Sequence, residues 1–230
     1  NESTRKRWLA NISHELRTPV AILSLELEMM LDKIKPMTEE NIASANDELK
    51  HLASLIEDLY QLTSADIGGM RYIKQVEDMT LFIKNEKTKL KNYLADTGIT
   101  LELDLLDQPI AIYCDKKRLT QLFENIMTNC AKYAQASLVK LSSSIDSTAK
   151  KPMLQIIIED NGRGVDPEHL PNLFEHLYRT DEARNRKEGG TGLGLAICKQ
   201  IVIAHNGEIS AAQSELGGLA ILITLPLTES

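Results

Sequence analysis

Aromatic residues are scarce in this chain of 230 residues, and its 26 basic residues are fewer than its 33 acidic residues. Phe, Trp and Tyr make up 4% of the sequence and hydrophobic residues 43%, so the core is expected to consist mainly of Leu, Ile, Ala and Met. The formal net charge of −7 argues against a general nucleic-acid-binding protein, because such proteins present a basic field. Positive charge is concentrated in one window, residues 179–187, which can still bind a polyanion.

Cysteines are few, and long apolar runs are missing. Cys114, Cys130 and Cys198 lie in apolar contexts without the spacing of metal ligands, so we expect buried, reduced thiols in a reducing compartment. No segment is long and apolar enough to span a bilayer, and no signal peptide is visible. Because the sequence starts within a helical pattern, we expect a missing upstream part, and any membrane attachment is assigned to that part.

Two helical patterns of apolar residues occupy residues 1–66. The first runs from about Arg5 to Ile34 with Pro19 inside it, where the missing backbone donor is expected to bend the helix. Thr38 is a suitable N-cap for the second helix. Each pattern forms a narrow apolar seam that one hairpin cannot fully bury. The sequence therefore predicts a dimeric antiparallel four-helix bundle with two helices per chain.

The remainder alternates between helical and strand patterns, which indicates an α/β domain. We expect a first domain over residues 1–66, a linker over 67–74 that contains a Gly-rich stretch, and a second domain over 75–230. The expected elements of the second domain are helices over 80–95, 115–133 and 193–205, and strands over 99–105, 110–114, 137–144, 153–159, 208–213 and 219–225.

The most informative motif is the run from Ser13 to Pro19, with sequence SHELRTP. On a helix, Glu15 lies beside His14, and Thr18 lies one turn along the same face. This arrangement places a nucleophile, a proton acceptor and a hydroxyl that can orient water in one patch. Taken alone, His14 is also compatible with an ordinary exposed helix histidine. The other histidines, interpreted as surface or lid residues, are His51, His169, His176 and His205.

A second motif, Asp160-Asn161-Gly162-Arg163-Gly164, directly follows a predicted strand. The Asp160 carboxylate can accept a hydrogen bond from the exocyclic amine of a base, and the glycines allow the backbone to approach the ring closely. An ordinary Asx-type turn is the alternative interpretation.

A third motif, Gly189–Leu195, opens a predicted helix, where free backbone N–H groups can bind phosphate. A flexible glycine-rich helix start is the alternative. The motif is not a P-loop, since no Lys-Ser/Thr pair follows the glycines, and Ile197 replaces the third glycine of the dinucleotide fingerprint.

Two amides lie four residues apart on the predicted helix before these motifs. Asn129 offers a neutral oxygen to a magnesium ion that phosphates mostly coordinate, and Asn125 shares its face. Lys132 and Tyr133 follow one turn later, where Lys132 can meet phosphate charge. Surface amides without a function are the alternative interpretation.

In order and content these motifs resemble the sensor histidine kinases of bacterial two-component systems over essentially the whole chain. The matching segments are Ser13–Pro19 (H box), Asn125–Tyr133 (N box), Asp160–Gly164 (G1 box), Leu173–Glu175 (F box) and Gly190–Leu195 (G2 box). Leu177 stands where an aromatic residue is common, and Cys130 where Ala is common; both are apolar and remove no chemical group.

This resemblance implies an α plus α/β fold: the helical bundle, followed by an α/β sandwich of the Hsp90, gyrase and histidine kinase type. It implies ATP and Mg²⁺ as cofactors, with Asn129 as the metal ligand. The catalytic residues would be His14, Glu15 and Thr18. The nucleotide-binding residues would be Asn125, Asn129, Lys132, Tyr133, Asp160, Gly162, Gly164, Arg179, Gly190, Thr191, Gly192, Leu193 and Gly194.

The implied reaction is phosphorylation of His14 from ATP with Glu15 as the base, followed by transfer to an aspartate on the receiver domain of a response regulator. Thr18 would orient water when that regulator is dephosphorylated. The implied protein is a homodimer, and this chain would be the cytoplasmic region of an inner-membrane sensor.

Two other classes of protein remain open at this stage. One is a non-catalytic dimeric scaffold that binds a nucleotide only as a regulator. The other is a DNA-handling or chaperone ATPase of the same superfamily. Those ATPases resemble one another in a Glu one turn before the magnesium Asn, and here that position is Asn125, which cannot activate water as a base. This difference favours a kinase over a hydrolase.

Overall fold

The computed structural model describes residues 2–66, 71–147, 151–180 and 192–228, without the side chains of residues 2–11, 14, 15, 51 and 64–66. The chain divides into two compact units, Asn1–Gly68 and Gly69–Ser230. The first is helical and the second combines helices with a five-stranded sheet. This is the α plus α/β class that the sequence predicts.

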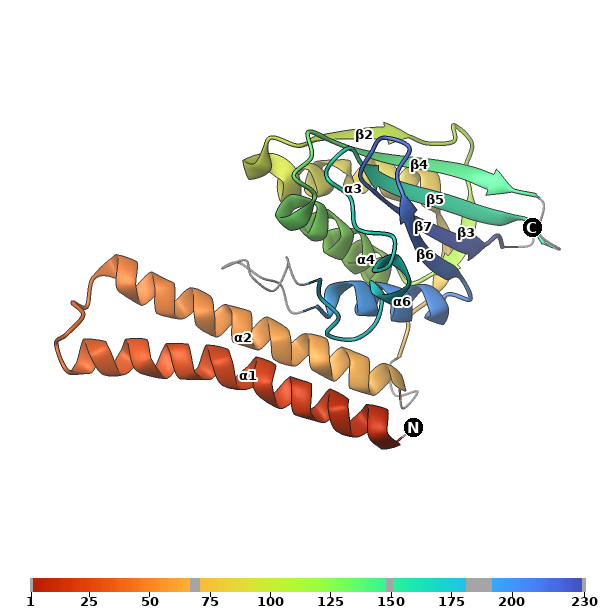
Figure 1. Ribbon diagram of the computed structural model, residues 1–230. Coiled ribbons are helices and arrows are strands. Elements are labelled where there is room, and N and C mark those ends of the chain that lie inside the picture. Colours follow the sequence, from red (N-terminus) through yellow and green to blue (C-terminus); the bar gives the residue numbers. More distant parts are fainter. Residues whose placement is uncertain (1, 67–70, 148–150, 181–191, 229–230) are drawn as a thin grey trace. The chain divides into compact units, whose positions relative to one another are not determined.

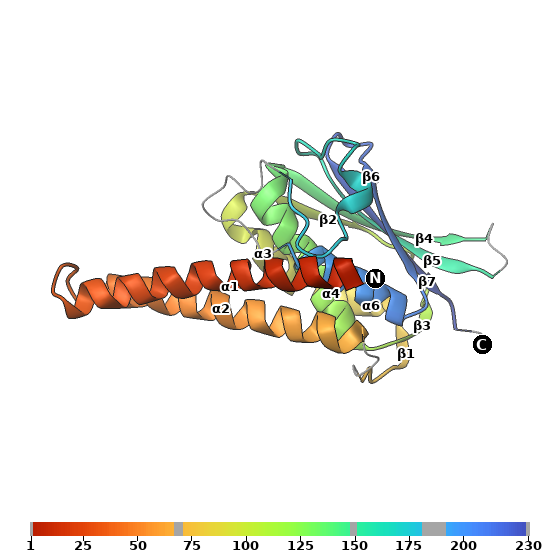
Figure 2. The same cartoon turned by 60° about the horizontal axis from the view of Figure 1, so that its bottom comes forward.

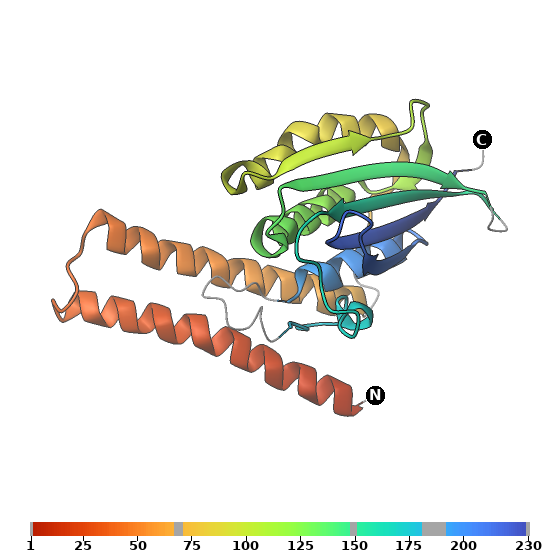
Figure 3. The same cartoon turned by 45° about the horizontal axis from the view of Figure 1, so that its top comes forward.

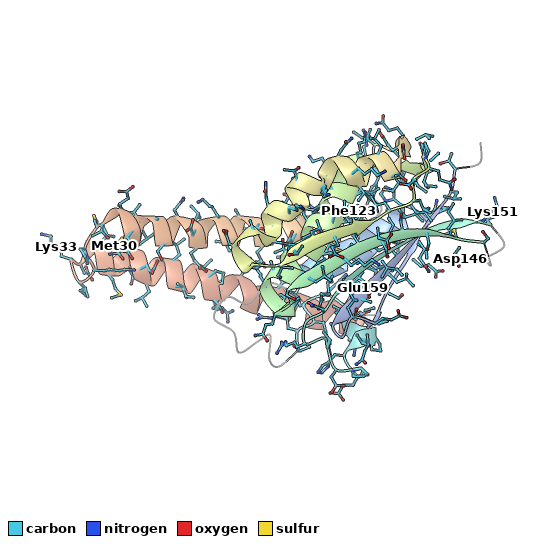
Figure 4. The ribbon with its side chains drawn as sticks, turned by 90° about the horizontal axis from the view of Figure 1, so that it is seen from above. Met30, Lys33, Phe123, Asp146, Lys151 and Glu159 are labelled. Carbon is cyan, nitrogen blue, oxygen red and sulfur yellow. The ribbon has the colours of Figure 1, made fainter. Side chains whose placement is uncertain are left out.

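The first unit is a hairpin of two long antiparallel helices, α1 (Glu2–Leu31) and α2 (Glu39–Asp66), seen in Figure 1. Met30 and Lys33 lie where α1 gives way to the connection, as Figure 4 shows. The predicted cap forms, because the backbone N–H of Asn41 donates to Thr38 Oγ1 at 3.2 Å. Pro19 lies inside α1 and is buried.

Within the hairpin, each helix buries one side and leaves a second apolar stripe in solvent. Met30, Ala45, Leu55 and Leu62 are buried. The exposed apolar side chains of the two helices include Val20, Leu27, Leu31, Ile42, Leu49, Ile56 and Tyr60. Helical geometry places Val20, Leu27 and Leu31 on one face of α1, and the seven-residue spacing does the same for Ile42, Leu49 and Ile56 on α2. These stripes are what a dimeric bundle would cover, and the dimer stays a prediction.

The second unit is built on a five-stranded sheet whose strand order is β2-β4-β5-β7-β6. Its strands are β2 (Thr100–Asp104), β4 (Leu138–Asp146), β5 (Met153–Asp160), β6 (Glu208–Gln213) and β7 (Leu219–Pro226). Strand β2 pairs with β4 in parallel, and the other pairs are antiparallel. Figure 3 shows the sheet with its twist.

Three helices cover one face of this sheet: α3 (Met79–Leu94), α4 (Lys116–Asn129) and α6 (Gly194–Ala204), as Figures 1 and 2 show. Burial alternates along the strands as this two-layer arrangement requires. Leu154, Ile156 and Ile158 of β5 are buried, whereas the residues between them are half-buried. Phe123 of α4, labelled in Figure 4, has no exposed surface.

A small second sheet joins the start of this unit to its interior. Strand β1 (Gln75–Asp78) pairs antiparallel with β3 (Ala111–Cys114), with Gln75 opposite Cys114. The sequence did not predict β1, because four residues with one apolar side chain carry too little alternation. The described part of this unit also contains the short helical turns η1 (Ala95–Thr97), η2 (Cys130–Ala134) and η3 (Leu170–Asn172).

Residues 71–74, in the segment predicted as a linker, make contacts with this unit. The N–H of Ile73 donates to Asp115 Oδ2 at 2.8 Å, and Lys74 Nζ donates to the Ala204 carbonyl at 2.5 Å. The Tyr72 ring packs edge-on against the His205 ring, with the centroids 5.7 Å apart. These contacts tie the segment to the N-terminus of α4 and the C-terminus of α6.

His205 is a core residue, so its interpretation as a surface or lid residue is wrong. Its side chain is 2% exposed, and burial lowers its pKa, which keeps the ring neutral. Nδ1 donates to the Ile201 carbonyl at 2.7 Å, so Nε2 can accept from the N–H of Asp115 at 2.9 Å. The polar ring is buried because both of its nitrogens have partners.

Candidate functional site

Helix α4 organises the site through its last turns. Asp115 caps its first turn by accepting from the N–H of Arg118 at 3.2 Å. The helix ends at Asn129 and widens into the π turn η2, which Gln135 closes with a φ of 52°. Such π turns occur often at functional sites because they redirect the side chains and carbonyls of a helix end.

Asn125 joins α4 to the start of α6. Its Nδ2 donates to the carbonyl of Gly194 at 3.2 Å, and its side chain also hydrogen-bonds Cys198. Burial raises the pKa of the Cys198 thiol to about 12, so this thiol is a packing group. Asn125 therefore fixes the glycine-rich helix start against α4.

Asp160, the last residue of β5, is a buried carboxylate with 3% of its surface exposed. Its Oδ1 accepts from the N–H of Gly162 at 2.9 Å, and the backbone of Leu219 also hydrogen-bonds the carboxylate. Burial raises the Asp160 pKa, and the two backbone bonds oppose that rise. A buried carboxylate with acceptor capacity left is well suited to accept from a ligand amine.

The loop after Asp160 packs directly on η2. A Cβ at Gly162 would lie 2.0 Å from the carbonyl oxygen of Ala134, so only glycine fits there. The N–H of Arg163 donates to that same oxygen at 3.1 Å. Cys130 of η2 lies near enough to Asp160 that, with burial as the larger cause, its pKa rises to about 12.

The glycine-rich motif makes a second contact, between Gly192 and Leu177. Gly192 has a φ of 70°, and its carbonyl accepts from the N–H of Leu177 at 3.1 Å. Leu177 also has a left-handed φ of 60°, a conformation that L-residues rarely adopt. Leu193 follows with no exposed surface, and Phe174 of the F box is 6% exposed.

The structure thus gathers part of the predicted site around the end of α4. Asn125 contacts Gly194, and η2, directly after Asn129, contacts the loop that follows Asp160, at Gly162. Gly164 lies in that loop with a φ of 67°. On η2, Lys132 is exposed and Tyr133 half-buried, and Arg179 is half-buried in its own segment.

Other predicted residues lie elsewhere. Gly190 and Thr191 lie outside the described residues. His14, Glu15 and Thr18 belong to α1 of the first unit. The side chains of His14 and Glu15 are not described, and Thr18 is exposed.

Sequence reasoning missed one contributor, the turn between β6 and β7. Gly218 packs so closely on Asp160 that a Cβ there would lie 1.9 Å from Oδ1. Its N–H donates to the Asp160 carbonyl at 3.1 Å. The Gly217-Gly218 pair was the available signal, but a glycine pair between two strands is more often an ordinary hairpin turn.

These features fit an adenine nucleotide. The loop after Asp160 packs its backbone on η2 at Gly162, and Asp160 supplies a buried acceptor beside this contact. Asn129 supplies a neutral oxygen ligand of the kind that Mg²⁺ accepts together with phosphates. Among the described residues, no group of three or more His, Cys, Asp or Glu side chains could hold a metal by itself.

Comparison with known proteins agrees with this geometry. Residues 114–229 match the family model described as "Histidine kinase-, DNA gyrase B-, and HSP90-like ATPase". The chain belongs to this family. Membership implies ATP binding and confirms the predicted sandwich type. Residues 4–68 match the His Kinase A (phospho-acceptor) domain.

Curated relatives carry the same two regions. The chain is 39% identical over 227 residues to the signal transduction histidine-protein kinase BaeS of Escherichia coli, covering 99% of this chain and 48% of BaeS. It is 34% identical over 228 residues to the sensor protein kinase WalK of Staphylococcus epidermidis, covering 98% of this chain and 37% of WalK. The chain therefore spans half or less of the length of these relatives.

A solved structure is also similar. The histidine kinase AdeS of Acinetobacter baumannii matches with a TM-score of 0.77 and 26% identity, over 94% of this chain and 98% of that chain. The resemblance to sensor histidine kinases is confirmed. Stretches such as Gly192–Cys198 and Ala204–Gly207 also predict a narrower resemblance to BaeS, and the match over 99% of this chain confirms that resemblance. No helix in the described part of the chain has the length and apolarity needed to cross a membrane.

Proposed function

We propose that this chain is the autokinase core of a two-component sensor. It would phosphorylate His14 from ATP and pass the phosphoryl group to an aspartate on the receiver domain of a response regulator. The observation that carries the nucleotide half of this proposal is the junction at the end of α4. There α4 contacts the glycine-rich start of α6 at Gly194, and η2, which directly follows α4, contacts the loop after Asp160 at Gly162.

Each residue has a distinct role in this proposal. Asp160 accepts from the exocyclic amine of adenine, and the backbone at Gly162 allows the ring to approach. Asn125 holds Gly194, and thereby the helix N-terminus that follows Gly192 and Leu193, in place for phosphate. Lys132 and Arg179 supply positive charge to the phosphates. Asn129 would hold Mg²⁺, which neutralises phosphate charge when bound.

The acceptor residues act from the first unit. Glu15 takes the proton from one ring nitrogen of His14, so that the other nitrogen attacks the γ-phosphorus and the bond to ADP breaks. Positioning supplies most of the acceleration. Asn125 offers no base for water, so hydrolysis does not compete with attack by histidine. Thr18, exposed on α1, would orient water when the same unit dephosphorylates the regulator.

The proposed setting follows from the relatives. The first unit would form a homodimer through its exposed apolar stripes, and the chain would be the cytoplasmic region of an inner-membrane sensor. The partner protein would be a response regulator whose receiver domain presents an aspartate. The proposal involves no nucleic acid.

The decisive experiment is autophosphorylation of the His14→Gln variant with γ-labelled ATP. We expect no acid-labile phosphate on the variant, with ATP affinity within a few-fold of wild type, because the acceptor and the nucleotide residues lie in separate units. Label on the variant would refute His14 as acceptor.

The two alternative classes are separated in the same assay. A scaffold regulated by nucleotide would bind ATP but leave wild-type His14 unlabelled. A hydrolysing ATPase would release phosphate continuously in a steady-state assay, whereas the proposed kinase turns over slowly without its partner.

A further inference from the structure

We propose that the turn between β6 and β7, residues 214–218, positions the Asp160 carboxylate for recognition of the base, with Gly218 as the positioning residue. This inference rests on the proposed function, since it assigns Asp160 to the exocyclic amine of adenine. It adds a determinant of base specificity that lies more than fifty residues along the chain from the motif it serves.

The turn and Leu219, the first residue of β7, contact Asp160 at three points. The N–H of Gly218 donates to the Asp160 carbonyl at 3.1 Å, and the backbone of Leu219 hydrogen-bonds the carboxylate itself. The α-carbon of Gly218 lies against the carboxylate, because a Cβ there would lie 1.9 Å from Oδ1 and 2.7 Å from the Gly162 nitrogen. The carboxylate is therefore confined between the N–H of Gly162 on one side and this turn on the other.

Confinement matters because Asp160 is otherwise free to rotate. An aspartate side chain has few rotamers, and a rotation of its carboxylate plane moves the acceptor lone pairs away from a fixed amine. Because two backbone N–H groups bond the carboxylate, one orientation of its plane is preferred. Its remaining acceptor lone pairs then face one direction. Burial of the carboxylate makes a misdirected or unpaired lone pair costly.

The turn is itself held rigid. Ser214, which is 8% exposed, donates from Oγ to Glu159 Oε2 at 2.7 Å and accepts from the N–H of Leu216 at 2.9 Å. Its own N–H donates to the Gly218 carbonyl at 2.9 Å. Glu159, labelled in Figure 4, precedes Asp160 on β5. The turn is thus tied to both residues at the end of that strand.

The test compares binding of ATP with binding of inosine triphosphate, in which a carbonyl oxygen replaces the exocyclic amine. The full chain binds each nucleotide in a calorimeter, and the readout is the ratio of the two Kd values. We expect wild type to favour ATP roughly tenfold or more, because a lost charge-assisted hydrogen bond has about that effect. Gly218→Ala should reduce the ratio to about threefold or less, because the added Cβ displaces the carboxylate.

Gly98→Ala is the matched control. Gly98 has a φ of 72°, and a Cβ added there would have no neighbouring atom within 4 Å, so alanine at this position costs stability through backbone strain alone. We expect lower thermal stability and an unchanged ratio. A ratio that falls equally in both variants, or one that Gly218→Ala leaves at the wild-type value while both affinities drop, would overturn the proposal.

If Gly218→Ala shows no cooperative unfolding transition, Ser214→Ala decides. It adds no atom and removes the hydroxyl bonds that hold the turn, so the ratio should fall at least about threefold. An unchanged ratio in this variant would refute the positioning role. A wild-type protein that binds both nucleotides equally would instead remove Asp160 from base recognition, which is a failure of the proposed function rather than of the turn.

Discussion

Replacing Leu27 by Glu should convert the proposed dimer into monomers without loss of ATP binding. Leu27 is 46% exposed on α1 in the single chain. It shares its face with Val20 and Leu31, which are 46% and 71% exposed. A helical hairpin with such a stripe on each helix is expected to cover it with a second copy of itself.

The size of the effect follows from this exposure. A fully buried leucine contributes about 1.5–3 kcal/mol, so covering the remaining half contributes about 1 kcal/mol. An unpaired carboxylate buried in the interface adds at least another ~1 kcal/mol even where water partly reaches it. Because a twofold interface contains each substitution twice, the dimer should lose about 4 kcal/mol or more. The dimer dissociation constant should therefore rise roughly a thousandfold.

Leu25→Glu is the matched control. It introduces the same change at a leucine that is 57% exposed but about 160° around the helix from Leu27. Sedimentation velocity over a micromolar concentration series should give dimers for wild type and Leu25→Glu and monomers for Leu27→Glu. Identical behaviour of the two variants would refute the assignment of the stripe to the interface. A wild-type monomer at these concentrations would refute the bundle.

Three further results are expected. Asp160→Asn should weaken ATP binding roughly tenfold or more while leaving thermal stability nearly unchanged, since burial already disfavours the charge; unaltered affinity in calorimetry would exclude this residue. Thr18→Ala should retain autophosphorylation and lose phosphatase activity toward the regulator, with the opposite bias in Glu15→Ala, as time courses of phosphate on both proteins would show. Burial, and to a smaller extent the charge of Glu57, raises the pKa of Asp58 to about 6, so the folded state loses stability as pH rises from about 4 to 6. Asp58→Asn removes this loss and should stabilise the hairpin by about 1–2 kcal/mol at pH 7.5, after allowance for partial exposure. At pH 4 the variant should not be stabilised in thermal melts.

Elements with a strong local period were predictable from the sequence. Helix α3 was expected over 80–95 and is observed at Met79–Leu94. Strand β7 was expected over 219–225 and is observed at Leu219–Pro226. Here burial on one face imposes a regular apolar spacing, and caps such as Asp115 mark the ends. The sheet order could not be predicted this way, because the spacing of apolar residues does not say which strands pair.

The nucleotide motifs were predictable for a different reason. Asp160 and Gly162 are close neighbours in sequence, so the chemistry of their site appears in one short string. Gly218 acts on the same carboxylate from another strand connection, and no local pattern relates it to Asp160. His205 was misread for the same reason, since the partner that explains its burial, the N–H of Asp115, is 90 residues away.

Asp115 shows how one buried side chain serves several parts of the second unit. Its Oδ1 caps α4, its Oδ2 accepts from Ile73, and its N–H donates to His205. The same helix ends at Asn129 and η2, against the loop after Asp160. Ile73, which follows the helical hairpin in sequence, is thus hydrogen-bonded to the N-cap of the helix whose other end leads into the proposed nucleotide site.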